Sequence, residues 1–554
     1  MKYNKFFLAA AVIGLIGVNS CSDDWDSHYK EVAPGQGKGS IWHEISTNSE
    51  LSNFKAVIEA CEFDHALNGS QVFTVFAPTN ACFSDTQRDS VIALYKEQAA
   101  KNVQYKRNDA IKEFVYNHVA LYNYSVADDT NDSIMLMNGK YAVLASSSFS
   151  GSDFTKSNML LDNGVLFTLS KVAAYKPNVY EYLRRDEDLS NLADFIYKYS
   201  IDTFYASLSV PGEIIDGKTH YLDSVTRQKN EVLQRWMHAE LFDEDSVYWY
   251  VAPTNEIWDE LVAEYETYFQ YDTRVKGRDS LMYNQPRKAI LLGTAFSQTE
   301  NPLKNRRDSV LSTNAVRYAY RKLYWGSYRH SYYQWMKPYD EGGIFADAQE
   351  IECSNGIVYK AQKWNFDKHN SFMIDLEMES EARASLDSVY TESTRDLTVR
   401  TVTTDNPFYD KVSNHSYVEL TNKGSGFYKA LFNVPQVLSN LKYDAYVVAV
   451  PAVAGDTLAS DAQRLPCKFR CTVSYHNEQG TEQKFPTTAV FTTDPTKVDS
   501  VLIGTYEFPT ASVALEDPQV KVLIEDRVSN SMVNKGEAVK TLRMDCIVFK
   551  PHVE

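Results

Sequence analysis

The sequence lacks the excess of basic residues that proteins bound to nucleic acids carry. Its 554 residues include 56 lysines and arginines against 73 aspartates and glutamates, a formal net charge of −17. Because contacts with phosphate groups need a basic footprint, this balance argues against DNA or RNA as a partner. The charge instead favours a soluble surface that repels other copies of the chain.

Patterns that carry catalysis or bind metal ions are also missing. The 11 histidines form no HExxH or HxH cluster, and the 7 cysteines form no CxxC pair. No GxSxG elbow, phosphate-binding P-loop or dinucleotide-binding glycine pattern occurs. Acidic pairs such as Glu377 with Glu379 are expected on solvated faces. The sequence therefore predicts no enzyme, no metal site and no cofactor.

Zinc-like spacing is absent among the cysteines, and the cysteines that follow Cys21 are scattered. We expect these six to be buried free thiols. They are Cys61, Cys82, Cys353, Cys467, Cys471 and Cys546. The chain is too long for a single core, and three domains are the natural expectation.

Long hydrophobic runs are limited to Phe6–Val18, which is too short to span a bilayer. With Lys2 and Lys5 before it and Cys21 after it, residues 1–20 resemble a bacterial lipoprotein signal peptide, with Cys21 as the acylated, palmitate-bearing residue. Ser22-Asp23-Asp24 resembles the acidic export signal of Bacteroidota lipoproteins. The resemblance implies a lipid anchor in the outer membrane that faces the cell exterior, joined to a flexible tether over residues 21–40. A simple cleaved secretory signal is the alternative.

One stretch occurs twice. Gln71–Phe83 contains a β-branched and aromatic run followed by Ala77-Pro78-Thr79-Asn80, which predicts a buried strand, a tight corner and the start of a helix. The same corner returns a domain's length later as Ala252-Pro253-Thr254-Asn255, behind Tyr248–Val251. This repeat indicates an internal duplication.

The repeated stretch resembles the first signature segment of fasciclin domains. Asn163-Gly164 and the residues that follow resemble the second segment, and His118 lies where the family carries a histidine, which we expect to be structural. In the second copy Asn355-Gly356 resembles the second segment, at a longer spacing and with no histidine matching His118. The resemblance implies tandem fasciclin-like domains over residues 41–178 and 179–366, the second of them divergent.

The last part of the chain alternates apolar and polar residues with the period of a strand. Cys467, Phe469, Cys471 and Val473 form one series, and Leu542, Met544, Cys546 and Val548 form another. Many short strands without helical patterns predict a C-terminal all-β sandwich or jelly roll over residues 367–554. The whole chain is thus expected to be a multidomain α+β protein. One further helix is expected over Thr219–Trp236.

The densest aromatic run is Tyr318–Tyr339, with arginines interleaved. Flat aromatic rings with a polar edge suit contacts with sugars and peptides, and the alternative is packing within a core or between domains. The candidate ligand-binding residues are Tyr324, Trp325, Tyr328, Tyr332, Tyr333 and Trp335. No tryptophan follows Trp364, which argues against a tryptophan platform in the last domain.

Two functions follow from the resemblance and the anchor. The first is a non-catalytic cell-surface lipoprotein that mediates adhesion or protein–protein contact through its fasciclin-like domains. The second is an accessory lipoprotein that captures glycan or peptide beside a TonB-dependent transporter and its SusD-like partner. A glycan-active enzyme hidden in the last domain is a third alternative.

Overall fold

The computed structural model separates the chain into two compact units, Met1–Pro177 and Asn178–Glu554. The structure describes residues 38–208, 210–215, 218–223, 226–299, 310–316, 321–322, 328–329, 332–382, 386–390, 397–421, 427–486 and 489–553. The predicted signal peptide, Cys21 and most of the tether lie outside these residues. None of the described helices is long and apolar enough to cross a membrane.

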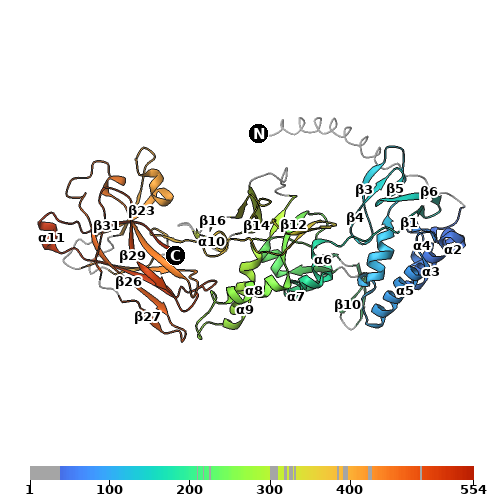
Figure 1. Cartoon of the computed structure of the whole chain (residues 1–554), viewed down its shortest axis with the longest axis horizontal. Coiled ribbons are helices and arrows are strands. Elements are labelled where there is room, and N and C mark those ends of the chain that lie inside the picture. The colour runs from blue at the N-terminus through green and yellow to red at the C-terminus, as the bar shows by residue number, and fades with distance from the viewer. Residues whose placement is uncertain are drawn as a thin grey trace, which may run out of the picture. The chain divides into compact units, whose positions relative to one another are not determined.

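The first unit packs helices against a seven-stranded sheet (Figure 1). Its helices are α2 (Ile41–Thr47), α3 (Ser52–Ala60), α4 (Asp64–Asn68), α5 (Asp85–Ala100) and the π-helix η3 (Ala110–Val115). The sheet has the order β2-β1-β7-β6-β5-β4-β3. Its strands are β1 (Phe73–Pro78), β2 (Val119–Leu121), β3 (Asn131–Met135), β4 (Tyr141–Ala145), β5 (Ser148–Phe149), β6 (Ser152–Leu161) and β7 (Gly164–Leu169).

Strand β1 lies at the centre of this unit because every one of its side chains is buried. Phe73 and Val75 pack with the helices, whereas Phe76 points to the other side and stacks on Phe149 with ring centroids 3.8 Å apart. A strand covered on both faces needs a continuous apolar run, which is what the sequence provides. The corner predicts a helix that opens at Ala81 behind Thr79 and Asn80, but residues 80–83 form a turn, and the helix α5 begins at Asp85, where Ser84 forms a capping box with Gln87.

The second unit opens with a smaller α+β layer. Its helical segments are α6 (Val179–Arg185), α7 (Ser190–Tyr197), the π-helix η7 (Val232–Met237), α8 (Asn255–Glu266) and α9 (Arg278–Leu291). Its sheet, in the order β13-β12-β19-β18, consists of β12 (Tyr248–Pro253), β13 (Ala295–Ser297), β18 (Gln349–Cys353) and β19 (Gly356–Ala361).

Eight further described strands of this unit form two-stranded pairs. They are β8 (Ser200–Phe204), β9 (Val210–Ile215), β10 (Lys218–Asp223), β11 (Thr226–Asn230), β14 (Val310–Val316), β15 (Arg321–Lys322), β16 (Tyr328–Arg329) and β17 (Tyr332–Met336). The helix predicted over Thr219–Trp236 is therefore wrong for most of its length. Strand β11 pairs with β8 over five residues, and such long-range pairing overrides a local helical pattern.

The remainder of unit 2 is the predicted β-sandwich (Figure 1). One sheet, which we call the first sheet, contains β20 (Leu376–Glu379), β22 (Leu397–Thr401), β23 (Ser416–Thr421), β25 (Lys442–Ala449), β29 (Asp499–Glu507) and β31 (Thr541–Pro551). The second sheet contains β21 (Leu386–Tyr390), β24 (Lys429–Val434), β26 (Lys468–His476), β27 (Glu482–Lys484), β28 (Phe491–Thr492) and β30 (Val520–Asp526). This part of unit 2 also contains the short helices α10 (Lys368–Ser371) and α11 (Asn530–Asn534).

Alternating side chains of both sheets form one core. Strands β25 and β30 bury every second residue, and the series Cys467, Phe469, Cys471 and Val473 points inward as predicted. The six described cysteines are free thiols, and all except the half-buried Cys82 are buried. The hydrophobic core continues from the sandwich into α6–α9, and the predicted boundary at residues 366–367 falls inside this unit.

The loop between α8 and α9 is docked onto the sandwich by hydrogen bonds. The Tyr271 hydroxyl donates to the Val513 carbonyl at 3.0 Å, and the Gln270 amide donates to the Ser439 hydroxyl at 2.9 Å. The Ser439 hydroxyl in turn donates to the Thr267 carbonyl at 2.9 Å. These hydrogen bonds link the helical part of unit 2 to its β-sandwich.

Candidate functional site

Two asparagines of unit 1 tie its helices to its sheet. Asn163 accepts from the Ile41 amide at 2.8 Å, and its side-chain amide donates to the carbonyls of Leu67 and Gly69, both at 2.8 Å. Asn80 accepts from the Asn53 amide at 3.0 Å and donates back to the Ser49 carbonyl at 2.8 Å. Each asparagine satisfies backbone groups at a helix end, so its role is architectural.

His118 is also bound on both ring nitrogens. Its Nδ1 lies 2.7 Å from the Phe114 carbonyl, and its Nε2 lies 3.2 Å from the Ala173 amide. These partners assign the neutral tautomer with the proton on Nδ1. Full burial lowers the pKa of the imidazole from 6.5 to about 4. Because the ring is buried and both of its nitrogens are hydrogen-bonded, these contacts support a structural role for His118.

The asparagine arrangement of unit 1 recurs in unit 2. Asn355 accepts from the Val179 amide at 2.9 Å and donates to the carbonyls of Leu241 and Asp243 at 3.0 and 2.8 Å. Asn255 accepts from the Asn191 amide at 2.9 Å and donates to the Glu187 carbonyl at 2.8 Å. Each bond matches one made by Asn163 or Asn80 in unit 1.

The strand register repeats as well. Gly164 lies beside Phe73 in the parallel pair β1–β7, and Gly356 lies beside Tyr248 in the parallel pair β12–β19. Both glycines have φ 145°, and a Cβ at either one would come within 1.9 Å and 1.8 Å, respectively, of a backbone carbonyl oxygen. Two sites with the same bonds, register and backbone angle are strong evidence of a duplicated architecture.

The register also shows what replaces His118. Val75 pairs with Val119 in unit 1, and the equivalent Tyr250 pairs with Ala295 in unit 2, so Thr294 occupies the histidine position. Its buried hydroxyl donates to the Leu291 carbonyl at 2.6 Å. The prediction that the second copy has no histidine here is correct.

The aromatic candidates divide into three groups. Tyr333 and Trp335 are 0% and 5% exposed and belong to a buried cluster, where the Trp335 indole donates to the Gly293 carbonyl at 3.1 Å. These two side chains pack in a core, so the prediction that they form a contact surface is wrong. Tyr328 and Tyr332 lie in strands β16 and β17. Tyr324 and Trp325 lie outside the described residues.

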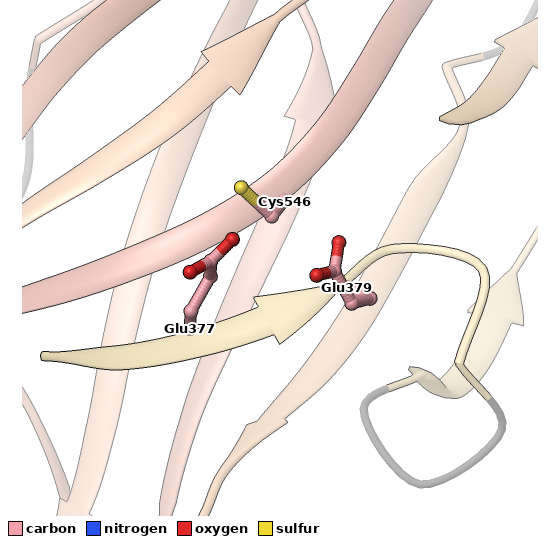
Figure 2. A group of neighbouring side chains, drawn as sticks. All are labelled: Glu377, Glu379 and Cys546. Atoms are coloured by element: carbon pink, nitrogen blue, oxygen red, sulfur yellow. The ribbon is translucent and has the colours of Figure 1, made fainter. Parts of the chain in front are cut away.

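A cluster that the sequence did not predict lies on the outer face of the first sandwich sheet. Figure 2 shows Glu377 and Glu379 of β20 facing Cys546 of β31, with their oxygen and sulfur atoms within 4.8 Å of one another. Glu379 is buried and accepts from the Ser413 hydroxyl at 2.6 Å, so the expectation of a solvated acidic pair is wrong for this residue. The neighbouring Asp545 accepts from the Ser413 amide at 3.0 Å.

A β-bulge creates this cluster. The pairing of β31 with β25 shifts between Ile547 and Met544, so Ile547 and Phe549 turn into the core. The predicted inward series through Cys546 and Val548 therefore fails after Met544. A bulge inserts one unpaired residue, and it reverses the faces of the residues beyond it. Two carboxylates and a thiol can serve as ligands of a divalent cation. Acidic groups of this kind also occur in proteins without a bound ion.

Beside the cluster runs a groove of about 370 Å³. Tyr446, Val448 and Val548 are among the residues that line it, together with Glu377 and Lys550. The Lys550 ammonium lies 6.0 Å from the centre of the Tyr446 ring and 3.9 Å from the Asp375 carboxylate. An aromatic ring between charged groups can bind a polar ligand that also presents an apolar face.

A wider hollow of about 740 Å³ lies where the α8–α9 loop meets the sandwich. Arg274 and Lys276 line it together with Asp272, Glu516 and Asp517. Because groups of both charges line the hollow, its lining does not favour a ligand of either charge.

Comparison with known families decides the identity of unit 1. Residues 49–174 match the fasciclin domain model. This part of the chain is a fasciclin domain. Its two signature segments and His118 all lie within the matched residues, as the sequence resemblance implied. No curated protein matches the chain.

Among solved structures, one match is the fasciclin domain pair of the insect cell adhesion molecule Fasciclin I. It is 12% identical, with a TM-score of 0.18, and the match covers 59% of this chain and 97% of that one. A xylan-binding family 22 module of a Paenibacillus barcinonensis protein is 13% identical over 32% of this chain and 92% of that one, with a TM-score of 0.19. The xylohexaose-bound module pair of a Clostridium thermocellum xylanase has a TM-score of 0.21 at 13% identity, over 32% of this chain and 29% of that one. Scores this low support no conclusion about the chain.

The fasciclin domain should lose stability in mild acid through His118. Its pKa is about 4 when folded against 6.5 when unfolded, so the unfolded state takes up the proton first as the pH falls. The stability conferred by the neutral ring is complete above pH 6.5 and declines towards pH 4, by about 3 kcal/mol in total. Denaturant unfolding of wild type and His118→Gln at pH 7 and pH 4 should show that this pH-dependent difference disappears in the variant. His65→Gln, at an exposed position, is the control, and an unchanged pH dependence in His118→Gln would contradict the assignment.

Proposed function

We propose that the protein is a non-catalytic cell-surface lipoprotein that mediates adhesion or protein–protein contact through two fasciclin domains. The fasciclin match to residues 49–174 supports the first domain. The bonds of Asn355 and Asn255, which repeat those of Asn163 and Asn80, support a second, divergent fasciclin domain at the start of unit 2. That repetition is the single observation that carries the proposal, because it implies that the chain keeps two copies of a domain linked to adhesion.

The proposal includes the anchor. Cys21 carries the lipid, residues 21–40 form the tether, and the body faces outward from the outer membrane. The support is the sequence pattern, since these residues precede most of those described. Export is compatible with free thiols here, since five of the six described cysteines are buried.

An apolar row on the first fasciclin domain is the contact surface we propose. The bridge between Ala120 and Leu136 brings β2 against β3, so Leu121 lies beside Met135, and Met135 pairs with Tyr141 of β4. These side chains and Val143 are 37–53% exposed. Solvent-facing apolar residues in adjacent strands form the kind of patch that binds other proteins.

Removing this row should abolish partner binding. The triple variant Leu121→Ser, Met135→Ser, Val143→Ser removes apolar contact area that a partner would bury, and we expect retention of protein partners to fall at least about tenfold. The measurement is a mild-detergent pull-down of the tagged protein from outer membranes and from cell-surface extracts, quantified by mass spectrometry.

The matched control changes three exposed apolar residues of the sandwich, Leu458, Val399 and Val533, to serine. Equal partner recovery by wild type and the apolar-row variant, with an intact fold, would refute the proposed surface.

The second candidate function is capture of glycan or peptide beside a TonB-dependent transporter and its SusD-like partner. The observation that favours it is the groove with Tyr446 between charged side chains on the sandwich. Recovery of a transporter and its lid in near-equal amounts, by wild type and apolar-row variant alike, would favour this function over adhesion.

A further inference from the structure

The outer face of the second sandwich sheet carries a concentration of positive charge. Strands β24, β26 and β30 alternate buried and partly exposed residues, which sets one face towards the core and one towards solvent. The outward positions include Lys429 on β24, Lys468 and Arg470 on β26, and Glu525 on β30. With Arg527, which follows β30, this face carries four cations and one carboxylate. The local charge is therefore positive, although the net charge of the chain is −17.

The strand register places these groups in two adjacent lines. Glu525 pairs with Arg470 on one side and with Lys429 on the other. The Arg527 amide donates to the Lys468 carbonyl at 2.9 Å, which aligns these two residues in the next line. Cross-strand neighbours in one line are about 5 Å apart, so the charges form a single patch, which we call the basic patch.

Glu525 is already fully engaged. Its Oε1 lies 3.0 Å from the Lys429 ammonium, and its Oε2 accepts from the Arg527 guanidinium at 3.0 Å. Arg470 makes no hydrogen bond or ion pair with the residues that the structure describes, and its Nε is buried without an acceptor. The Nε of Arg527 is buried in the same way. Because no described carboxylate pairs with the Arg470 guanidinium, its terminal nitrogens are suited to an added anionic acceptor, whereas the buried Nε is out of a ligand's reach.

The neighbouring outward positions indicate what else the ligand offers. Leu431 pairs with Leu523 in the next line, and Asn433 pairs with Lys521 beyond it. From Lys429 to Asn433 the strand runs about 13 Å, which is room for a short oligosaccharide.

We propose that this face binds an acidic polysaccharide whose sugars carry carboxylate groups. A carboxylate pairs with the Arg470 guanidinium through two parallel hydrogen bonds, and the apolar face of a sugar ring covers Leu431 and Leu523. An acidic protein segment would satisfy the cations but presents no flat ring face to these two leucines. The basic patch and the Tyr446 groove lie on different sheets, so this inference goes beyond the glycan-capture candidate, and it is independent of the apolar row and of adhesion.

The test measures binding of the full chain to polygalacturonate, to the neutral galactan made by reducing its carboxyl groups, and to poly-L-glutamate. We expect binding to polygalacturonate that weakens with added salt, and at least about tenfold weaker binding by Arg470→Gln. Arg400→Gln, which changes a surface arginine of the first sheet, should bind like wild type. Circular dichroism confirms the fold of each variant, and Arg527→Gln serves as a second probe if Arg470→Gln does not fold.

Three results would overturn the proposal. They are the absence of binding to polygalacturonate, equal affinity for the neutral galactan, and unchanged affinity in folded Arg470→Gln. Equal or tighter binding of poly-L-glutamate would assign the basic patch to an acidic protein instead of a glycan. None of these outcomes bears on partner binding by the apolar row, so failure here and failure of the adhesion proposal are distinguishable.

Discussion

Gly164→Ala should unfold the fasciclin domain while unit 2 stays folded. At φ 145° an alanine is strained, and its Cβ would lie 1.9 Å from the Phe73 carbonyl oxygen, a backbone atom in the central strand pair. Relief would require β1 and β7 to separate, so we expect a loss above about 4 kcal/mol, a large part of the stability of a domain. Thermal unfolding followed by circular dichroism should show the transition of unit 1 lost and that of unit 2 retained.

The duplicated architecture makes the reciprocal experiment informative. Gly356→Ala should damage unit 2 and leave the fasciclin domain folded, because its Cβ would lie 1.8 Å from the Tyr248 carbonyl oxygen. Gly139 and Gly277 have φ 81° and 74°, and a Cβ at either position would meet no atom within 4 Å, so changing either to alanine controls for the backbone angle alone. A loss in the Gly164 variant no larger than in the Gly139 variant would contradict the close approach of β1 and β7.

The second large effect is expected at the paired asparagines. Asn355→Ala removes one acceptor and two donors, and it leaves the Val179 amide and the carbonyls of Leu241 and Asp243 without these partners. Buried backbone groups left unsatisfied cost about 1–3 kcal/mol each, so a loss of about 3–5 kcal/mol is expected. Asn163→Ala should cost unit 1 a similar amount, as measured by denaturant unfolding.

The control for the asparagines is Asn158→Ala. Asn158 bonds the Val126 backbone through exposed hydrogen bonds, where water replaces the lost partner, and alanine at its φ of 53° adds a backbone cost, so the expected loss is about 2 kcal/mol. If Asn163→Ala destabilised the chain and Asn355→Ala did not, the two sites would differ in energetic role, and the second fasciclin domain would lose its main support.

The sequence was sufficient to locate the first fasciclin domain because its signature residues lie in short contiguous segments. Asn80 follows β1 and Asn163 precedes β7, although their partners Asn53 and Ile41 are 27 and 122 residues away, and the apolar run of β1 is buried on both faces. Local patterns of this kind survive in the sequence as motifs. The same logic identified Asn255 and Asn355 despite the longer spacing of the second copy.

Long-range pairing accounts for what the sequence could not indicate. The cluster of Glu377, Glu379 and Cys546 depends on a bulge in β31. The alternation of residues within that strand does not predict where the register shifts. The isolation of Arg470 depends on Glu525 being engaged by Arg527, two residues away, and by Lys429, which lies on another strand. The aromatic run was overestimated as a surface because Tyr333 and Trp335 fill the core of the second copy.

The most direct test of the central claim is adhesion of beads coated with the full chain through its N-terminus. Wild type, the apolar-row variant and the sandwich control are compared for aggregation and for binding to cells under flow. The account predicts adhesion by wild type and the sandwich control, and loss of at least about tenfold in the apolar-row variant. Equal adhesion by all three proteins, or none by wild type, would contradict contact through the fasciclin domain.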